Sequence, residues 1–151
     1  MKTCSVVVLA AGRSQRMGTG VSKVLLPVGG QPALQHVIDA ALTLAPLEII
    51  GVIADTKISE QINGVDRWVF QEQARGTADA VSTALTEVRG EQLLILYADM
   101  PLIDAKDLSR LVQHTDLALL SGLTQQPNDY GRLKRDDAGN VHAIVEAKHD
   151  T

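Results

Sequence analysis

The chain has 151 residues and a mass of 16.2 kDa, which is the size of a single domain. Its 45% hydrophobic and 21% charged residues are typical of globular proteins and exclude collagen-like or disordered chains. A formal net charge of −4 excludes an overall basic field for nucleic acid, and the single cysteine, Cys4, excludes an internal disulfide framework. No apolar run approaches the ~20 residues that span a bilayer. We therefore expect a cytoplasmic protein that binds neither nucleic acid nor membrane.

The first half of the chain alternates strand-like and helix-like segments. The β-branched run at residues 5–10 predicts a strand buried on both faces, followed by a polar loop over residues 11–23. Residues 32–44 carry apolar side chains at helical spacing, and residues 48–54 predict a second buried strand. Two shorter elements follow, a helix over residues 59–63 and a strand over residues 67–70.

The second half continues the alternation and then changes character. We expect a helix over residues 76–88 with Thr77 as its N-cap, a central strand over residues 92–97, and a helix that Asp104 caps. Further strands are expected over residues 117–123, 130–135 and 141–146, the last two joined as a hairpin by the turn residues 136–140. The whole pattern predicts a single α/β domain over residues 1–151. Its fold is a Rossmann-like, mostly parallel sheet with helices on both faces and a C-terminal β-hairpin.

The loop after the first strand is the first candidate binding region, because ligands of such sheets bind beyond the carboxyl ends of the strands. Ala11 and Gly12 allow a ligand to approach the backbone closely. Arg13, Arg16 and Lys23 place three cations within eleven residues, a concentration of charge that suits a triphosphate. A solvated glycine loop with surface basic residues is an equally good interpretation of this composition alone.

Two further candidates follow later strands. Asp99 comes directly after the central strand, and its carboxylate is a suitable oxygen ligand for Mg²⁺. A turn cap is the alternative role, for which Asp104 is better placed. Gln71 follows the short strand and offers both amide groups to the edge of a base. The backbone at Gly76 approaches the same region, and we interpret Asp79 as an acid of the first helical turn.

These segments resemble the sugar-phosphate nucleotidylyltransferase family. The resemblance rests on Leu-Ala-Ala-Gly-x-x-x-Arg-Met at residues 9–17, Lys-Val-Leu-Leu-Pro at residues 23–27, Gly-Thr-Ala-Asp-Ala at residues 76–80 and Ala-Asp-Met-Pro at residues 98–101. The tyrosine at position 97, Tyr-Gly-Arg at residues 130–132 and Glu-x-Lys at residues 146–148 most resemble the uridylyltransferase domain of bacterial N-acetylglucosamine-1-phosphate uridylyltransferases. Those enzymes often carry glycine and histidine at the positions of Ala78 and Asp79.

The resemblance implies a reaction and a set of roles. The chain would make UDP-N-acetylglucosamine, a cell wall precursor, from UTP and N-acetylglucosamine-1-phosphate with Mg²⁺. The implied site residues are catalytic Arg16 and Lys23, the metal ligand Asp99, nucleotide-binding Ala11, Gly12, Arg13, Gln71, Gly76 and Thr77, and sugar-binding Tyr97, Gly131 and Glu146.

One departure from the family pattern concerns length. The family's catalytic domain continues beyond the hairpin that ends at Glu146, and this continuation carries further sugar contacts and a second metal ligand. The bifunctional members of the family also have a β-helix domain. None of these can be matched in this chain, so we expect a domain that is incomplete at its C-terminal end. Two alternatives stay open: a nucleotide-binding module without turnover, and a nucleotidyltransferase for another base or acceptor. The sequence leaves the oligomeric state unknown.

Overall fold

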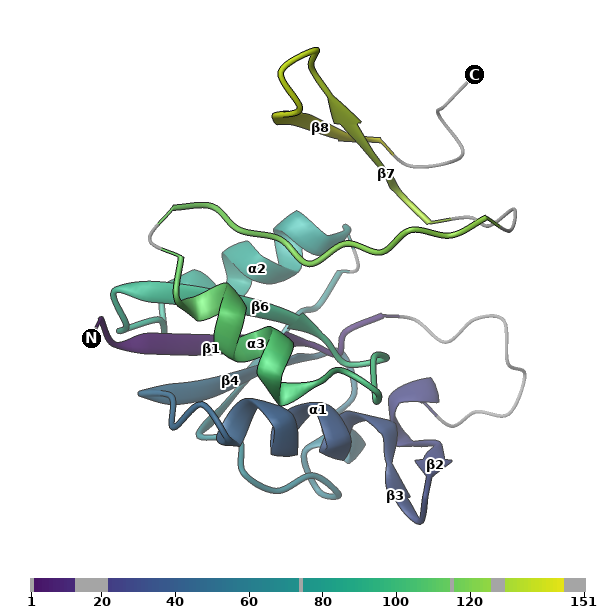
Figure 1. The fold of residues 1–151 in the computed structure, drawn as a ribbon. Helices are drawn as coiled ribbons and strands as arrows, with labels where there is room; N and C mark the ends of the chain where they lie inside the picture. Colours follow the sequence, from purple (N-terminus) through teal and green to yellow (C-terminus); the bar gives the residue numbers. More distant parts are fainter. Residues whose placement is uncertain (1, 13–21, 74, 115, 126–129, 146–151) are drawn as a thin grey trace. The chain divides into compact units, whose positions relative to one another are not determined.

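The structure is a computed structural model that describes residues 2–12, 22–73, 75–114, 116–125 and 130–145 (Figure 1). The chain divides into two compact units, Met1–Leu120 and Ser121–Thr151. The first unit contains the main sheet and its helices, and the second contains a hairpin.

A parallel sheet of four strands forms the centre of the first unit. Its strands are β1 (Cys4–Leu9), β4 (Glu48–Ile53), β5 (Arg67–Phe70) and β6 (Gln92–Tyr97), arranged in the order β5-β4-β1-β6. Because β1 and β4 lie in the middle, both faces of these strands are covered and their side chains are almost entirely buried. This explains why their sequences are continuous apolar runs rather than alternating patterns.

Helices cover both faces of this sheet (Figure 1). The helices α1 (Ala33–Leu42) and α3 (Ala105–Val112) pack on the face that Val6 and Val8 present. The helix α2 (Thr77–Leu85) packs through its alanines on the opposite face, against Val7 and Val52. Short elements connect these layers: the 3₁₀ turns η1 (Lys23–Leu25) and η2 (Thr56–Ile58) and the strand pair β2 (Pro27–Val28) and β3 (Gln31–Pro32). The predicted α/β fold with helices on both faces is therefore confirmed.

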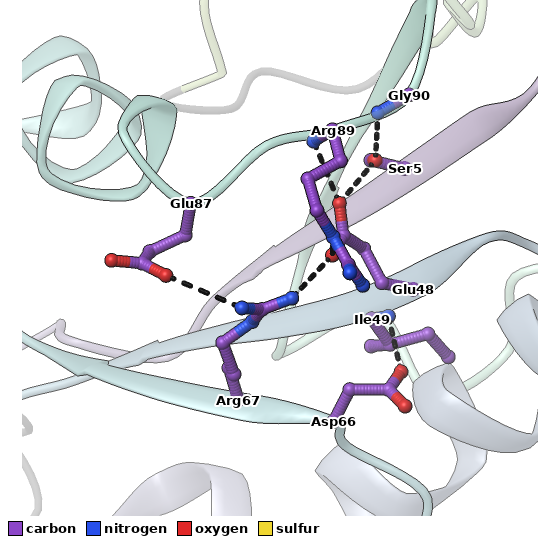
Figure 2. Close-up of polar contacts among 8 residues, drawn as sticks. All are labelled: Ser5, Glu48, Ile49, Asp66, Arg67, Glu87, Arg89 and Gly90. Atoms are coloured by element: carbon purple, nitrogen blue, oxygen red, sulfur yellow. Dashed lines mark hydrogen bonds and ion pairs between the residues drawn. The ribbon is translucent and has the colours of Figure 1, made fainter.

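A buried carboxylate ties the amino ends of the strands together (Figure 2). Glu48, whose side chain is 0% exposed, accepts hydrogen bonds from the Ser5 hydroxyl at 2.8 Å and from the Arg89 backbone N–H and Nε at 2.7 Å each. It also accepts one from Arg67 Nη2 at 2.8 Å. Burial alone would raise the pKa of Glu48, but the hydrogen bonds from Ser5 and Arg89 and the charge of Arg89 lower it to about 2. The carboxylate is thus held charged inside the protein.

The second unit is an antiparallel hairpin of β7 (Arg132–Arg135) and β8 (Val141–Val145). Asp136 organises its turn, because its Oδ1 accepts hydrogen bonds from the backbone N–H groups of Ala138 and Asn140 at 3.0 and 2.8 Å. Hydrogen bonds from Asn140 lower the pKa of the Asp136 carboxyl below its ordinary value. Gly139 adopts φ +85°, a conformation that favours glycine. The predicted C-terminal hairpin and its turn are confirmed.

Three local predictions are wrong. The apolar run at residues 117–123 forms no strand in the described chain, because no neighbouring strand provides the hydrogen bonds that would make it one. The short helix expected over residues 59–63 does not form; these residues are turn and irregular chain after the 3₁₀ turn η2, which the Asp55 carboxylate caps through the Lys57 N–H at 3.0 Å. The N-cap of α2 is Gly76, not Thr77.

The cap of α3 was predicted correctly. Asp104 accepts a hydrogen bond from the Lys106 backbone N–H at 2.8 Å. Among the residues that the structure describes, no helix has the length and apolar character needed to cross a membrane. The cytoplasmic location stays a prediction.

Candidate functional site

A pocket of about 240 Å³ opens at the carboxyl ends of β1 and β6, next to the first turn of α2. It lies within the first unit and at the edge of the sheet where the fold predicts ligands to bind. Eight of the residues expected at the site from sequence line this pocket: Ala11, Gly12, Lys23, Gln71, Gly76, Thr77, Tyr97 and Asp99. Segments that are far apart in sequence are thus brought to one place.

Backbone hydrogen bonds fix the floor of this pocket. The Ala10 N–H donates to the Val52 carbonyl at 2.8 Å, and the Ala98 N–H donates to the Leu9 carbonyl at 3.1 Å. These bonds extend the ladders of the sheet by one residue beyond β1 and β6. Apart from its chain neighbours, no atom of the described residues lies within 4 Å of a Cβ atom added at Gly12, so the described part of the loop leaves room for a ligand against the backbone.

An ion pair crosses the pocket between Lys23 and Asp99. The Lys23 Nζ lies 2.6 Å from the Asp99 Oδ2, and the two side chains are 42% and 46% exposed. Lys23 starts η1 and Asp99 follows β6, so each charge is held by a different element. Because both groups remain accessible to solvent, a ligand can exchange partners with them at a small cost in free energy.

Gln71 is the most buried polar residue of the pocket, with 5% of its surface exposed. Its backbone N–H donates to the Ile53 carbonyl at 2.8 Å and so continues the pairing of β4 with β5. Its side-chain Nε2 donates to the Asp79 Oδ2 of α2 at 2.6 Å. The backbone and the side-chain amide of Gln71 are therefore both hydrogen-bonded within the protein in the absence of a ligand.

The turn before α2 requires glycine at position 76. Gly76 has φ +110°, where an L side chain would be strained, although a Cβ atom there would meet none of the described residues beyond its chain neighbours. This conformation lets the chain leave Gln71 and enter α2 within a few residues. Gly76 and Thr77 thereby line the same pocket as Gln71.

Four of the predicted residues lie outside the described part of the first unit. Gly131 lies immediately before β7 in the second unit, where it is exposed to solvent. Arg13, Arg16 and Glu146 lie outside the described residues. Tyr97, at the end of β6, is 47% exposed at the rim of the pocket.

Two features of the site were missed by sequence reasoning. Neither the contact between Lys23 and Asp99 nor the hydrogen bond between Gln71 and Asp79 has a local sequence signal, since each joins residues in different elements. The first could have been found by pairing opposite charges at the ends of adjacent loops. The second could have been found because Gln71 and Asp79 flank one tight glycine turn.

The comparison with protein families matches residues 6–129 to the MobA-like NTP transferase domain. Among curated proteins, the chain is 44% identical over 149 residues to the bifunctional protein GlmU of Stutzerimonas stutzeri (strain A1501). That match covers 95% of this chain but 33% of the relative. The chain thus spans about a third of the length of the curated relatives that it matches.

Solved structures agree on the fold. The nucleotidyl transferase Mth528 from Methanothermobacter thermautotroptrophicus matches with a TM-score of 0.68 and 26% identity, covering 77% of this chain and 59% of that chain. Rv0371c of Mycobacterium tuberculosis H37Rv, in its complex with manganese, matches with a TM-score of 0.59 and 23% identity, covering 74% of this chain and 59% of that chain.

Proposed function

The chain belongs to the MobA-like NTP transferase domain family, and from that premise we propose that it makes UDP-N-acetylglucosamine from UTP and N-acetylglucosamine-1-phosphate. The observation that carries the proposal is that Gln71, Lys23 and Asp99 line the same pocket at the carboxyl ends of the parallel strands. An amide suited to a base edge, a cation suited to phosphate and a carboxylate suited to a metal ion thus line one cavity. The likeness to GlmU over 95% of this chain supports the choice of substrates.

The reaction we propose is a direct displacement. An oxygen of the sugar phosphate attacks the α-phosphorus of UTP in line, and pyrophosphate leaves, so no covalent enzyme intermediate is formed. Catalysis then comes from positioning the two substrates and from neutralising negative charge. When the nucleotide binds, Lys23 separates from Asp99 and binds phosphate oxygens in its place. Arg16 neutralises the leaving pyrophosphate, and Arg13 assists with the outer phosphates.

The nucleotide occupies the pocket of the first unit. Gln71 binds the uracil edge, while the backbone of Ala11, Gly12, Gly76 and Thr77 lies against the base and the phosphates. The pocket-lining positions of these residues and the small size of three of them support this arrangement. Tyr97, at the rim of the pocket, contacts the sugar phosphate. The family resemblance assigns Gly131 and Glu146 to sugar binding as well.

A divalent cation, for which we propose Mg²⁺, suits the residues that are present. Among the described residues no three His, Cys, Asp or Glu side chains gather to hold a metal ion. However, Mg²⁺ is commonly bound through one or two carboxylates together with substrate phosphates and water. Asp99, half-exposed in the pocket, meets this requirement. When bound, Mg²⁺ neutralises phosphate charge during transfer.

Pyrophosphate release tests the proposal. The full chain should release pyrophosphate from UTP only when N-acetylglucosamine-1-phosphate and Mg²⁺ are both present. Saturable UTP binding without release would contradict turnover and favour a nucleotide-binding module. Faster release from CTP or GTP than from UTP would contradict the choice of uridine and favour a transferase for another base.

A further inference from the structure

The side chain of Gln71 has a fixed direction that Asp79 imposes. A carboxylate only accepts hydrogen bonds, so the group of Gln71 that lies 2.6 Å from Asp79 Oδ2 has to be the amide nitrogen. Rotating the amide by half a turn would place its carbonyl oxygen against the carboxylate oxygen, where the two would repel each other. The order of donor and acceptor along the exposed edge of Gln71 is therefore set before a ligand binds.

A fixed amide distinguishes bases that a free amide accepts equally. Uracil presents an N3–H donor beside carbonyl acceptors, whereas cytosine presents an N3 acceptor beside an amino donor. A glutamine that can rotate pairs with either edge by exchanging its oxygen and nitrogen. If the glutamine amide cannot rotate, one of the two bases meets it with donor facing donor and acceptor facing acceptor. The binding free energy of that base is then less favourable, because buried polar groups are left without partners.

The surroundings of Gln71 support such a fixed role. The residue is 5% exposed and lines the pocket, and its backbone is held by the Ile53 carbonyl at 2.8 Å. Among the described residues, the Asp79 carboxylate is its one hydrogen-bonded side-chain partner. The carbonyl oxygen and the second N–H of the Gln71 amide thus stay available for a ligand. Asp79 itself does not line the pocket, so its influence on a base passes through Gln71.

We infer that Asp79 is a positioning residue that makes Gln71 select uracil over cytosine in the nucleoside triphosphate site. This inference rests on the proposed function, because it assumes that the pocket binds the base of a pyrimidine nucleotide. The two side chains meet at 2.6 Å across the glycine turn that leads into α2. Replacing the Asp79 carboxylate therefore allows the Gln71 amide to rotate while the amide itself stays in the pocket.

The test compares the affinities of UTP and CTP, measured by calorimetric titration of the full chain in the presence of Mg²⁺. The unchanged protein should prefer UTP by about tenfold or more. Asp79→Asn keeps the size of the side chain and still hydrogen-bonds to Gln71, but its own amide can donate or accept. It should reduce the preference to about twofold or less, mainly by strengthening CTP binding.

Two further variants separate positioning from general damage. Thr83→Ala removes the hydrogen bond from the Thr83 hydroxyl to the Asp79 backbone carbonyl, 2.8 Å long, and leaves the carboxylate in place. It should lower the thermal midpoint and keep the preference for UTP. Gln71→Leu should weaken the binding of both nucleotides and abolish the preference.

The outcomes distinguish this inference from the proposed function. If Asp79→Asn keeps the full preference for UTP, or if the unchanged protein binds UTP and CTP equally, the positioning role is wrong and the nucleotide site still stands. If the unchanged protein binds neither nucleotide, the proposed function fails and the inference fails with it.

Discussion

The two ends of one parallel sheet each hold a carboxylate against a basic side chain, at almost the same distance. At the amino end, Glu48 lies 2.7 Å from Arg89 and 2.8 Å from Arg67, and its side chain is fully buried. At the carboxyl end, Asp99 lies 2.6 Å from Lys23, and both are nearly half-exposed. Distance therefore does not distinguish the two sites, but burial does.

The difference shows which charges are committed to the fold and which are available to a ligand. Glu48 accepts hydrogen bonds at both carboxylate oxygens from four donors, and water cannot replace those donors in the interior. Asp99 and Lys23 lose little when they separate, because water hydrates each of them. The amino end should thus govern stability, and the carboxyl end should govern binding.

The largest expected effect comes from Glu48→Ala. The change leaves the Ser5 hydroxyl and two arginines without their shared acceptor, and should lower the free energy of unfolding by about 3 kcal/mol. Urea unfolding monitored by circular dichroism measures it. Glu87→Ala is the matched control, because Glu87 pairs with Arg67 at 3.6 Å while 42% exposed, and it should cost less than about 1 kcal/mol. Equal losses for the two variants would contradict the importance of burial.

The second prediction concerns pH. Because the pKa of Glu48 falls from 4.5 to about 2 on folding, its contribution to stability is complete above pH 4.5 and is lost as the pH falls towards 2. The shift corresponds to about 3 kcal/mol over that range. Urea unfolding at several pH values should show this loss in the unchanged protein and a shallower one in Glu48→Gln. If the free energy of unfolding has the same dependence on pH in both proteins, groups other than Glu48 cause the acid sensitivity.

The third prediction moves to the carboxyl end. Asp99→Asn removes the negative charge that we assign to Mg²⁺ binding and should weaken Mg²⁺-dependent nucleotide binding by about tenfold or more. Isothermal titration with UTP, with and without Mg²⁺, measures the change. Asp107→Asn is the control, since that carboxylate pairs with Arg110 on α3 at 3.4 Å and does not line the pocket. Unchanged metal dependence in Asp99→Asn would show that the metal ligand is misassigned.

The smallest expected effect is that of Lys23→Met on the ligand-free protein. The ion pair with Asp99 is half-exposed, so its loss should change the free energy of unfolding by less than about 1 kcal/mol. Urea unfolding without nucleotide measures it. A loss as large as that of Glu48→Ala would mean that the carboxyl-end pair is structural and would remove the contrast between the two ends.

Much of the fold could be predicted because its signals are local. The bounds of β5 and β6 follow from apolar runs between turn residues, and the cap of α3 follows from one aspartate before a helical pattern. The strand predicted at residues 117–123 fails for the opposite reason. An apolar run has strand propensity, but a strand also needs a hydrogen-bonded neighbour, which no residue pattern within the run can specify.

For the candidate site, too, some features could be predicted from the sequence and others could not. Positions after the strands could be predicted, because parallel strands bring their carboxyl ends to one edge. The partners of those residues could not. Asp79 has an ordinary explanation as a first-turn acid, and only the glycine turn at position 76 in three dimensions brings it to Gln71.

The most direct test of the central claim is a titration of the full chain with UTP, followed by thermal shift with and without Mg²⁺. A ligand that binds only the folded state raises the midpoint by mass action, so the account predicts a saturable increase that depends on Mg²⁺. The increase should be smaller in Asp99→Asn and in Gln71→Leu, since both residues line the pocket. No shift with UTP at any concentration, in the presence of Mg²⁺, would contradict the assignment of this pocket to a nucleoside triphosphate.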